Sequence, residues 1–141
     1  MSDIKDYEEY RNKQDEYCEK YKKNLESCIE VSCPLGWMDM VIELTEKCLK
    51  LQPDLQILQI KSKFGGLRFY VGSALNEVHD LIDEAENKSY SLCEECGMPA
   101  KSVNLGWVYT VCPKHEKQII ETRDRQEKEW REKQAQKNEE K

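Results

Sequence analysis

Three cysteines and one histidine in the second half of the chain have the spacing of a metal site. Two residues separate Cys93 from Cys96, and two residues separate Cys112 from His115. Two pairs of this kind are typical of a tetrahedral Zn²⁺ site, because short turns present sulfur and nitrogen atoms from both pairs to one ion. We therefore expect these four residues to bind a single Zn²⁺. The alternative interpretation is a set of three buried thiols beside an unrelated histidine.

The donor set indicates the role of this ion. Four protein ligands leave no coordination position for water, so the expected zinc is structural and not catalytic. It supplies folding free energy that a short ligand segment cannot obtain from a core of its own. His79 is the other histidine of the chain, and no Ser–His–Asp or Cys–His pairing stands out. We expect a protein that is not an enzyme, with a metal-dependent nuclease as a distant alternative.

The residues around the two pairs predict the elements that position the ligands. Gly97 follows the first pair and favours a tight knuckle whose backbone amides turn toward the thiolates. Residues 102–111 are β-prone around a turn at 104–106, and Pro113 suits the first position of a helix. A knuckle, a hairpin and a helix carrying the second pair resemble a treble-clef zinc finger over residues 91–125.

The segment before the finger predicts a helix followed by a hairpin. Apolar residues at helical spacing indicate a helix over residues 37–51. Two β-prone runs, 55–63 and 67–71, lie on either side of Gly65-Gly66 and indicate an antiparallel hairpin. This helix and hairpin are expected to belong to the core of the protein.

A second amphipathic helix is expected over residues 74–89, with Ser73 as its N-cap. Residues 32–90 then form a small α-β-β-α core of the α+β class. The residues at helical spacing that we expect to be buried in this helix are Leu75, Val78, Ile82 and Ala85.

Long polar helices are predicted at both ends. Residues 3–27 contain no helix breaker, and Asp3 is a candidate cap. Residues 116–141 alternate in charge at helical intervals, which indicates an exposed helix that frays near its end. The expected organisation is an N-terminal helical arm (1–31), the core (32–90), the zinc finger (91–118) and a charged C-terminal helix (119–141).

The N-terminal helix carries a row of tyrosines on one face. Two interpretations of this row remain open. It docks on the core through its rings, or it contacts a partner or a second copy of the chain, which would make a homodimer. The tyrosines are Tyr7, Tyr10, Tyr17 and Tyr21.

Composition limits the class of protein. Of the 141 residues, 38% are hydrophobic and 35% are charged, so part of the chain must be solvated helix or tail. The net charge is −6 and no large segment is basic overall, which argues against broad nonspecific DNA binding. We expect neither a membrane span nor a secretory signal, because no long apolar run is present, and therefore a cytoplasmic location.

Four of the seven cysteines do not fit the metal spacing. In a reducing compartment a disulfide framework is not expected, so we expect these four to act as small buried hydrophobic residues. They are Cys18, Cys28, Cys33 and Cys48.

The predicted hairpin carries Lys61, Lys63 and Arg68 beside Phe64, in a chain that is otherwise acidic. A phosphate or carboxylate could dock there, because the glycines of the turn allow close backbone approach. Aromatic residues with arginine also suit a protein contact. The third interpretation is a simple turn with a solvated basic face.

The order of these motifs resembles a family of small uncharacterised proteins encoded mostly by bacteriophages and prophages. The residues that carry the resemblance are Gly36-Trp37, the string from Gln59 to Tyr70 that contains Lys-Phe-Gly-Gly-Leu-Arg-Phe-Tyr, and the two Cys/His pairs. The resemblance covers about residues 34–115 and leaves out both terminal helices. Because the family has no settled biochemical role, the resemblance implies a context and not a function.

Two functions are consistent with these observations. The first is a phage or mobile-element accessory protein that binds and inhibits a host protein, such as a nucleic-acid-handling defence complex; an anti-CRISPR protein is one concrete form. The second is a nucleic-acid-binding regulator that uses the basic hairpin. The candidate partner-binding residues are Tyr7, Tyr10, Tyr17, Tyr21, Lys61, Lys63, Phe64, Arg68, Arg123 and Arg125.

Overall fold

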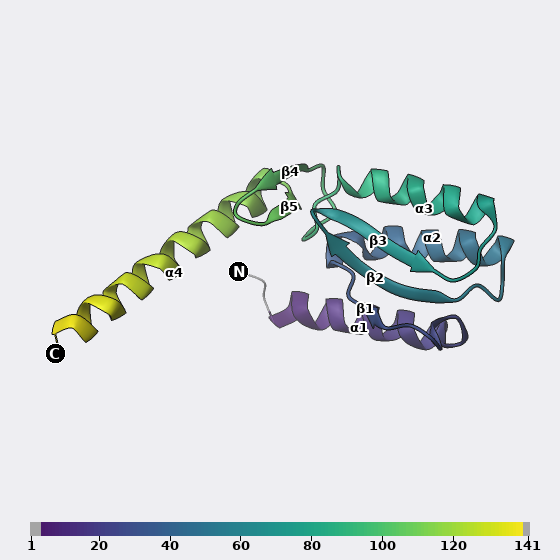
Figure 1. Ribbon diagram of the computed structural model, residues 1–141, viewed down its shortest axis with the longest axis horizontal. Helices are drawn as coiled ribbons and strands as arrows, with labels where there is room; N and C mark the ends of the chain where they lie inside the picture. The colour runs from purple at the N-terminus through teal and green to yellow at the C-terminus, as the bar shows by residue number, and fades with distance from the viewer. Residues whose placement is uncertain (1–3, 140–141) are drawn as a thin grey trace.

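A three-stranded sheet with helices forms one part of the molecule, and a two-stranded hairpin with a long helix forms the other (Figure 1). The computed structural model describes the backbone of residues 4–139 and the side chains of residues 8–138. The α+β class that the sequence predicts is confirmed. In chain order the elements are α1 (Ile4–Lys20), the 3₁₀ turn η1 (Lys22–Leu25), β1 (Glu30–Val31), the 3₁₀ turn η2 (Leu35–Trp37), α2 (Met38–Leu51), β2 (Ile57–Lys63), β3 (Gly66–Val71), α3 (Asn76–Ser89), β4 (Lys101–Asn104), β5 (Val108–Val111) and α4 (Pro113–Glu139).

The predicted hairpin is present as β2 and β3, which pair antiparallel with Lys63 opposite Gly66. Its turn consists of Phe64 and Gly65, whose φ angles are 53° and 77°. Positive φ at both central residues is the geometry of a type I′ turn, whose twist matches that of the two strands. The two residues of the turn are therefore Phe64 and Gly65, one position earlier in the chain than the Gly65-Gly66 pair that indicated the turn.

The sheet contains a third strand that the sequence analysis missed. β1 pairs parallel with β2, with Glu30 opposite Gln59, and gives the order β1-β2-β3. A strand of two residues is too short to show an alternating pattern, so only the tertiary structure identifies it. The sheet therefore includes residues from the segment that we expected to be a separate N-terminal arm.

The two core helices lie close to their predicted positions, but the start of α3 differs. Ser73 is not its N-cap, because the helix begins at Asn76 and the cap position is Leu75, which makes no side-chain cap bond. Gln52, at the end of α2, holds this loop: its amide donates to the Ser73 carbonyl over 2.9 Å and its oxygen accepts from the Leu75 N–H over 3.0 Å. Leu75 is consequently exposed and not part of the buried face.

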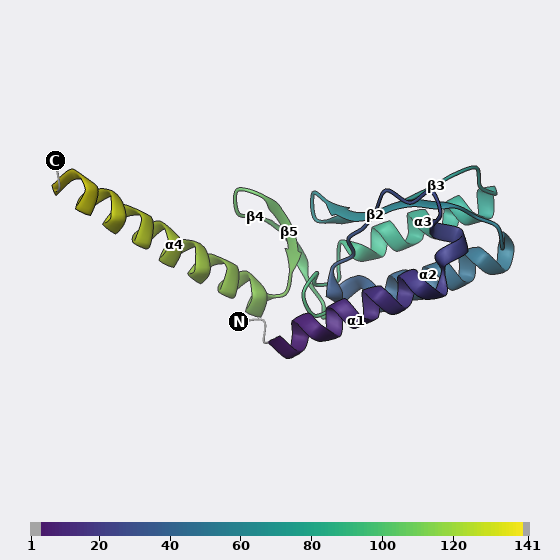
Figure 2. The same cartoon turned by 90° about the horizontal axis from the view of Figure 1, so that it is seen from below.

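The helices α2 and α3 cover one side of the sheet, which Figure 2 shows edge-on. The N-terminal helix α1 packs against α2 and ends at Lys20, earlier than predicted, and η1 follows it. The Asp3 cap lies outside the described residues. The core between these elements draws on α1, η2, α2, the sheet and α3, and its fully buried large side chains include Trp37, Met38, Leu55, Ile57, Ile60 and Leu67.

Candidate metal centre

Local structure places the four predicted ligands around one point. Cys93 and Cys96 lie on a knuckle that is closed by a bridge between Leu92 and Pro99. Cys112 lies between β5 and α4, and His115 is in the first turn of α4, which begins at Pro113 as the sequence predicts. The hairpin β4–β5 between the pairs returns the chain from the knuckle to the helix.

The distances between the donor atoms fit a tetrahedral metal ion. The three sulfurs and the ring nitrogen lie within 4.8 Å of one another. Cys96 Sγ is 3.8 Å from Cys112 Sγ, and His115 Nδ1 is 3.5 Å from Cys93 Sγ and 3.1 Å from Cys112 Sγ. Zinc bonds of about 2.3 Å to sulfur and about 2.0 Å to nitrogen give tetrahedral edges of about 3.8 Å and 3.5 Å, so two of these distances match and the Cys112–His115 distance is shorter. The cluster can therefore hold a metal ion, and its Cys₃His donor set and spacing are consistent with zinc.

Backbone hydrogen bonds shape the knuckle. The Gly97 N–H donates to the Cys93 carbonyl, and the Cys93 N–H donates to the Met98 carbonyl, each over 2.8 Å. Gly97 has φ 75°, a conformation that glycine adopts without strain. The Met98 N–H also donates to the Cys96 sulfur. The predicted turning of amides toward a thiolate is present here.

The cysteine ligands differ in how readily they ionise. The His115 backbone N–H donates to the Cys112 sulfur and lowers the pKa of this thiol to about 6, because the bond favours the thiolate. Partial burial raises the pKa of Cys96 to about 11, and the neighbouring Cys93 and Cys112 sulfurs act in the same direction. A metal ion that binds here must displace the proton from Cys96, since zinc takes the thiolate form.

The knuckle is joined to the core through Gly36 and Trp37. The Gly36 N–H donates to the Glu94 carbonyl over 2.8 Å, and the Trp37 indole N–H donates to the Leu92 carbonyl over 2.9 Å. A Cβ on Gly36 would lie 2.1 Å from the Cys93 carbonyl oxygen, so only glycine fits against the knuckle. Gly36-Trp37 is one of the motifs quoted in the sequence analysis. In the structure both residues hold the knuckle against the core, Gly36 by close packing and Trp37 by a hydrogen bond.

Glu94 is a second link that the sequence analysis missed. Its backbone N–H donates to the Thr110 carbonyl and its carboxylate accepts from the Thr110 N–H, each over 2.9 Å. Burial raises the pKa of this carboxyl, while hydrogen bonds from the Thr110 N–H and the Ser62 hydroxyl lower it. Glu94 thus connects the knuckle to β5 and to β2, and nothing in the Cys-Glu-Glu-Cys pattern distinguishes it from its neighbour Glu95.

The two glycines of the hairpin face different neighbours: Gly65 faces the finger, and Gly66 faces Tyr90 at the end of α3. The Thr110 hydroxyl donates to the Gly65 carbonyl, and a Cβ on Gly65 would lie 3.2 Å from the Val108 side chain. A Cβ on Gly66 would lie 2.4 Å from the Tyr90 ring. The two glycines therefore allow close packing of protein against protein. The expectation that they admit a phosphate or carboxylate to the backbone is not supported, because these neighbours cover them.

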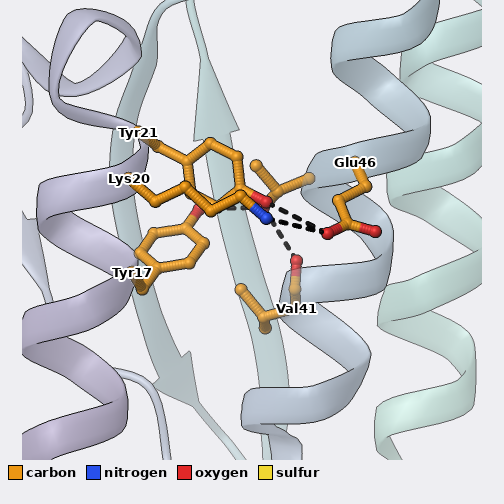
Figure 3. Close-up of polar contacts among 6 residues, drawn as sticks. Tyr17, Lys20, Tyr21, Val41 and Glu46 are labelled. Atoms are coloured by element: carbon orange, nitrogen blue, oxygen red, sulfur yellow. Dashed lines mark hydrogen bonds and ion pairs between the residues drawn. The ribbon is translucent and has the colours of Figure 1, made fainter.

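The tyrosine row does not form a partner surface as a whole. Tyr17 and Tyr21 are 3% and 6% exposed and belong to the core. The Tyr17 hydroxyl lies 2.8 Å from the Thr45 hydroxyl, which donates to the Val41 carbonyl (Figure 3). Assigning these two residues to a partner contact is therefore wrong, because α2 already occupies their face. Tyr10 is half-buried, and the side chain of Tyr7 lies outside the described part of the chain.

The basic residues do not gather in one place. Arg68 forms an ion pair with Glu86 on α3. Lys61 and Lys63 lie on β2, with Lys63 near the Phe64 ring at the turn. Arg123 lies on α4, where its guanidinium donates to the Leu105 carbonyl, and Arg125 is exposed two residues further along. The hairpin lysines and the α4 arginines are thus on different elements.

An open groove of about 920 Å³ runs beside the metal donors, between α1, the start of α2, the knuckle and α4. Two of the four candidate metal ligands, Cys96 and His115, line it. Charged side chains also line it, among them Lys13, Asp39 and Glu95. Lys13 is 3.6 Å from Asp39 across it. Within residues 8–138, the charged side chains of the lining are five carboxylates and three lysines, so the groove has a small acidic excess and carries no cluster of cations for an anion.

The comparisons with known proteins give no relative. No model of a known protein family matches the chain, and no similar chain is found among curated proteins or among solved structures. Within the residues that the structure describes, no helix is both long and apolar enough to span a membrane.

Proposed function

We propose that the protein is a non-enzymatic, zinc-stapled module that binds a host protein through α4. The observation that carries the proposal is the reach of this helix. Beyond the bond between Arg123 and Leu105, α4 extends away from the rest of the molecule in both views (Figures 1 and 2). Within the described part of the chain, the ion pair of this outer segment, Glu127–Arg131, is internal to α4, so its surface is available to a partner.

Trp130 is the candidate anchor on this helix. It is 60% exposed and stands among charged residues, with the Glu127–Arg131 ion pair beside it. Tryptophan contributes large apolar area to interfaces and is enriched among residues that dominate binding energy. The surrounding charges of both signs keep the helix solvated and suit a polar rim around such an anchor.

The metal site supports a binding role and not catalysis, because four protein ligands leave no open coordination position on the ion. In this proposal one Zn²⁺ takes all four protein ligands, in a treble-clef arrangement, and stabilises the hairpin from which α4 starts. The zinc then has no position for a substrate, and its work is to hold α4 at a defined angle to the core.

The proposal that the host protein belongs to a cell infected by a phage, and that the module inhibits it, rests on the motif resemblance to small phage and prophage proteins. The net charge of −6 is complementary to the basic grooves of proteins that handle nucleic acid. An inhibitor of a host defence complex is therefore the form of the proposal that we would test first.

The test is affinity capture from host lysate after nuclease treatment, followed by reconstitution with the purified captured protein. The wild-type chain should retain one stoichiometric protein. Trp130→Ala should weaken the reconstituted complex by about tenfold or more, because an interface tryptophan typically contributes over 1.4 kcal/mol.

The matched control is Glu132→Gln, two residues further along and therefore on the opposite face of the same helix. It should bind as the wild type does, and both variants should keep their zinc and helix content. Equal binding by Trp130→Ala and Glu132→Gln would refute the assignment of α4 as the partner surface.

A further inference from the structure

The side of the sheet opposite α2 and α3 carries no helix in either view (Figures 1 and 2). Strand alternation sends Ile60 and Phe69, which are opposite each other, into the core. Their neighbours Lys61 and Tyr70 therefore project from the other face, where Tyr70 is 44% exposed. This open face holds aromatic and basic side chains in a chain whose net charge is negative.

Phe64, at the end of this face, is held in a costly conformation. Its φ is 53°, in the left-handed region that bulky residues rarely adopt, and its ring is 58% exposed. The exposed ring gains little from burial in its own chain, while asparagine or glycine would adopt the same turn without strain. Strain of this kind that is not compensated by packing is a mark of a functional residue.

The charges of the face favour an anion. Lys61 and Lys63 form no ion pair within the described part of the chain, and the Lys63 ammonium lies 5.7 Å from the centre of the Phe64 ring. Among the described residues, two carboxylates pair with side chains of this face: Glu30 accepts from the Gln59 amide, and Glu86 pairs with Arg68, which lies opposite Lys61. Arg68 adds little, because Glu86 neutralises it.

The finger contacts the hairpin near the turn. Gly65 packs against the Val108 side chain of β5. Phe64 and Trp107 are each one residue along the chain from this contact, and Trp107 is 59% exposed. Arg123 donates to the Leu105 carbonyl in the β4–β5 turn, so this turn carries an exposed ring and a cation of its own.

We propose that the helix-free face of the β1–β2–β3 sheet, together with the β4–β5 turn, binds single-stranded nucleic acid. Unpaired bases stack on exposed aromatic rings, and lysines contact the phosphates that join them. Phe64 and Tyr70 are the stacking residues, and Lys61 and Lys63 are the phosphate contacts. Duplex bases are already stacked on each other and fit this surface less well. This activity is independent of the α4 partner proposed above.

The test measures binding of a fluorescein-labelled 15-nucleotide oligothymidine strand to the zinc-loaded full chain by fluorescence anisotropy at low salt. Phe64→Asn should weaken binding by about tenfold, the effect typical of losing one stacked base. The same variant should melt at a higher temperature than the wild type, because Asn-Gly is the favoured type I′ sequence. Weaker binding by a more stable protein excludes misfolding as the cause.

The phosphate contacts have a separate readout. Replacing both Lys61 and Lys63 by Gln should reduce the slope of log affinity against log salt by about 1.4, because each phosphate contact on a single strand contributes about 0.7. Lys50→Gln, on the exposed side of α2, and Leu75→Ala, at the start of α3, are matched controls that should bind as the wild type does.

Three outcomes would overturn the proposal. One is no binding of the oligothymidine strand or of the corresponding oligouridine strand. Another is equal affinity for a duplex of the same length. The third is unchanged affinity in Phe64→Asn. If oligonucleotides do not bind but Phe64→Asn weakens the complex with the captured host protein, the face is a protein contact instead.

Discussion

The sheet with its helices and the finger with α4 are stabilised by different means. The first part buries large side chains from six elements, among them Trp37, Met38 and Ile57. In the finger, the buried hydrophobic residues that form a cluster are Cys93, Val111 and Cys112, and two of these three are metal donors. The hydrophobic effect can hold the first part together, whereas the finger has a small core of its own and is expected to depend on a metal ion bound by its candidate ligands.

The junction between the two parts is nevertheless tight. Gly36 and Gly65 each place bare backbone against the finger. The Trp37 indole donates to the Leu92 carbonyl, and Glu94 accepts from the Gly36 N–H and the Ser62 hydroxyl. A module with an independent finger would have a linker here. The comparison therefore predicts that metal loss disrupts the finger first and reaches the core only through the junction.

The largest effect is expected from removing one metal ligand. Cys96 is exposed, so Cys96→Ser removes a thiolate without opening a cavity in a core. We expect zinc affinity to fall by more than about a hundredfold, with loss of the β4–β5 amide signals. Zinc content by elemental analysis and two-dimensional NMR measure both. The control Cys28→Ser should bind one zinc ion, and a Cys96→Ser finger that stays folded with chelator present would contradict the prediction.

The next largest effect is expected at the junction. In Gly36→Ala the new Cβ meets backbone atoms of Cys93 and Gly97 at 2.1 and 2.6 Å, so the knuckle and η2 must separate. The expected loss is about 3 kcal/mol in the free energy of unfolding. The control is Gly72→Ala, whose nearest contact would be 3.8 Å and whose φ is ordinary. Urea unfolding that gives equal midpoints for the two variants would show that the junction is loose.

Alkaline pH should weaken the core through its buried thiols. Burial raises the pKa of Cys48 from 9.0 to about 11, and it also raises the pKa of Cys33. Above pH 9 the unfolded thiol releases its proton while the folded thiol keeps it, so stability falls as pH rises from about 9 to 11.

Each such thiol should lower the free energy of unfolding by up to about 1.4 kcal/mol per pH unit. Urea midpoints at pH 8 to 11 with saturating zinc measure this slope, and Cys48→Ala should flatten it. If Cys48→Ala leaves the slope unchanged, the pKa of the Cys48 thiol is the same in the folded and the unfolded protein, which would contradict the prediction.

The smallest changes in stability are expected from two contacts of α1 with α2, one buried and one exposed. Tyr17→Phe removes a hydroxyl whose buried partner is Thr45 and should lower the free energy of unfolding by about 1 kcal/mol. The exposed Lys20–Glu46 pair, 3.2 Å apart beside it, should contribute less than the Tyr17 hydroxyl when Lys20→Ala removes it, because solvent screens the two charges (Figure 3). Thermal unfolding compares the two, and a larger effect of Lys20→Ala would mean that α1 is held mainly by its charges.

Much of the metal site could be predicted because its information is local. Cys93, Cys96, Cys112 and His115 lie within one short segment, and each pair is brought together by a turn or a first helical turn. The β2–β3 hairpin is local for the same reason. The residues that hold the site to the core were not predicted, because Glu94 and Thr110 have no special spacing and meet only after the finger has folded.

The sequence by itself determined the ligand set, the α+β class and the main helices and hairpins, since turns and residue periodicity depend on near neighbours. The tertiary structure alone decided which side of α1 is buried, because Tyr17 meets Thr45 across 28 residues of chain. It also decided that β1 joins the sheet and that Gly65 packs on the finger. These features depend on contacts between elements far apart in the chain, where many arrangements satisfy the same local pattern and packing selects one.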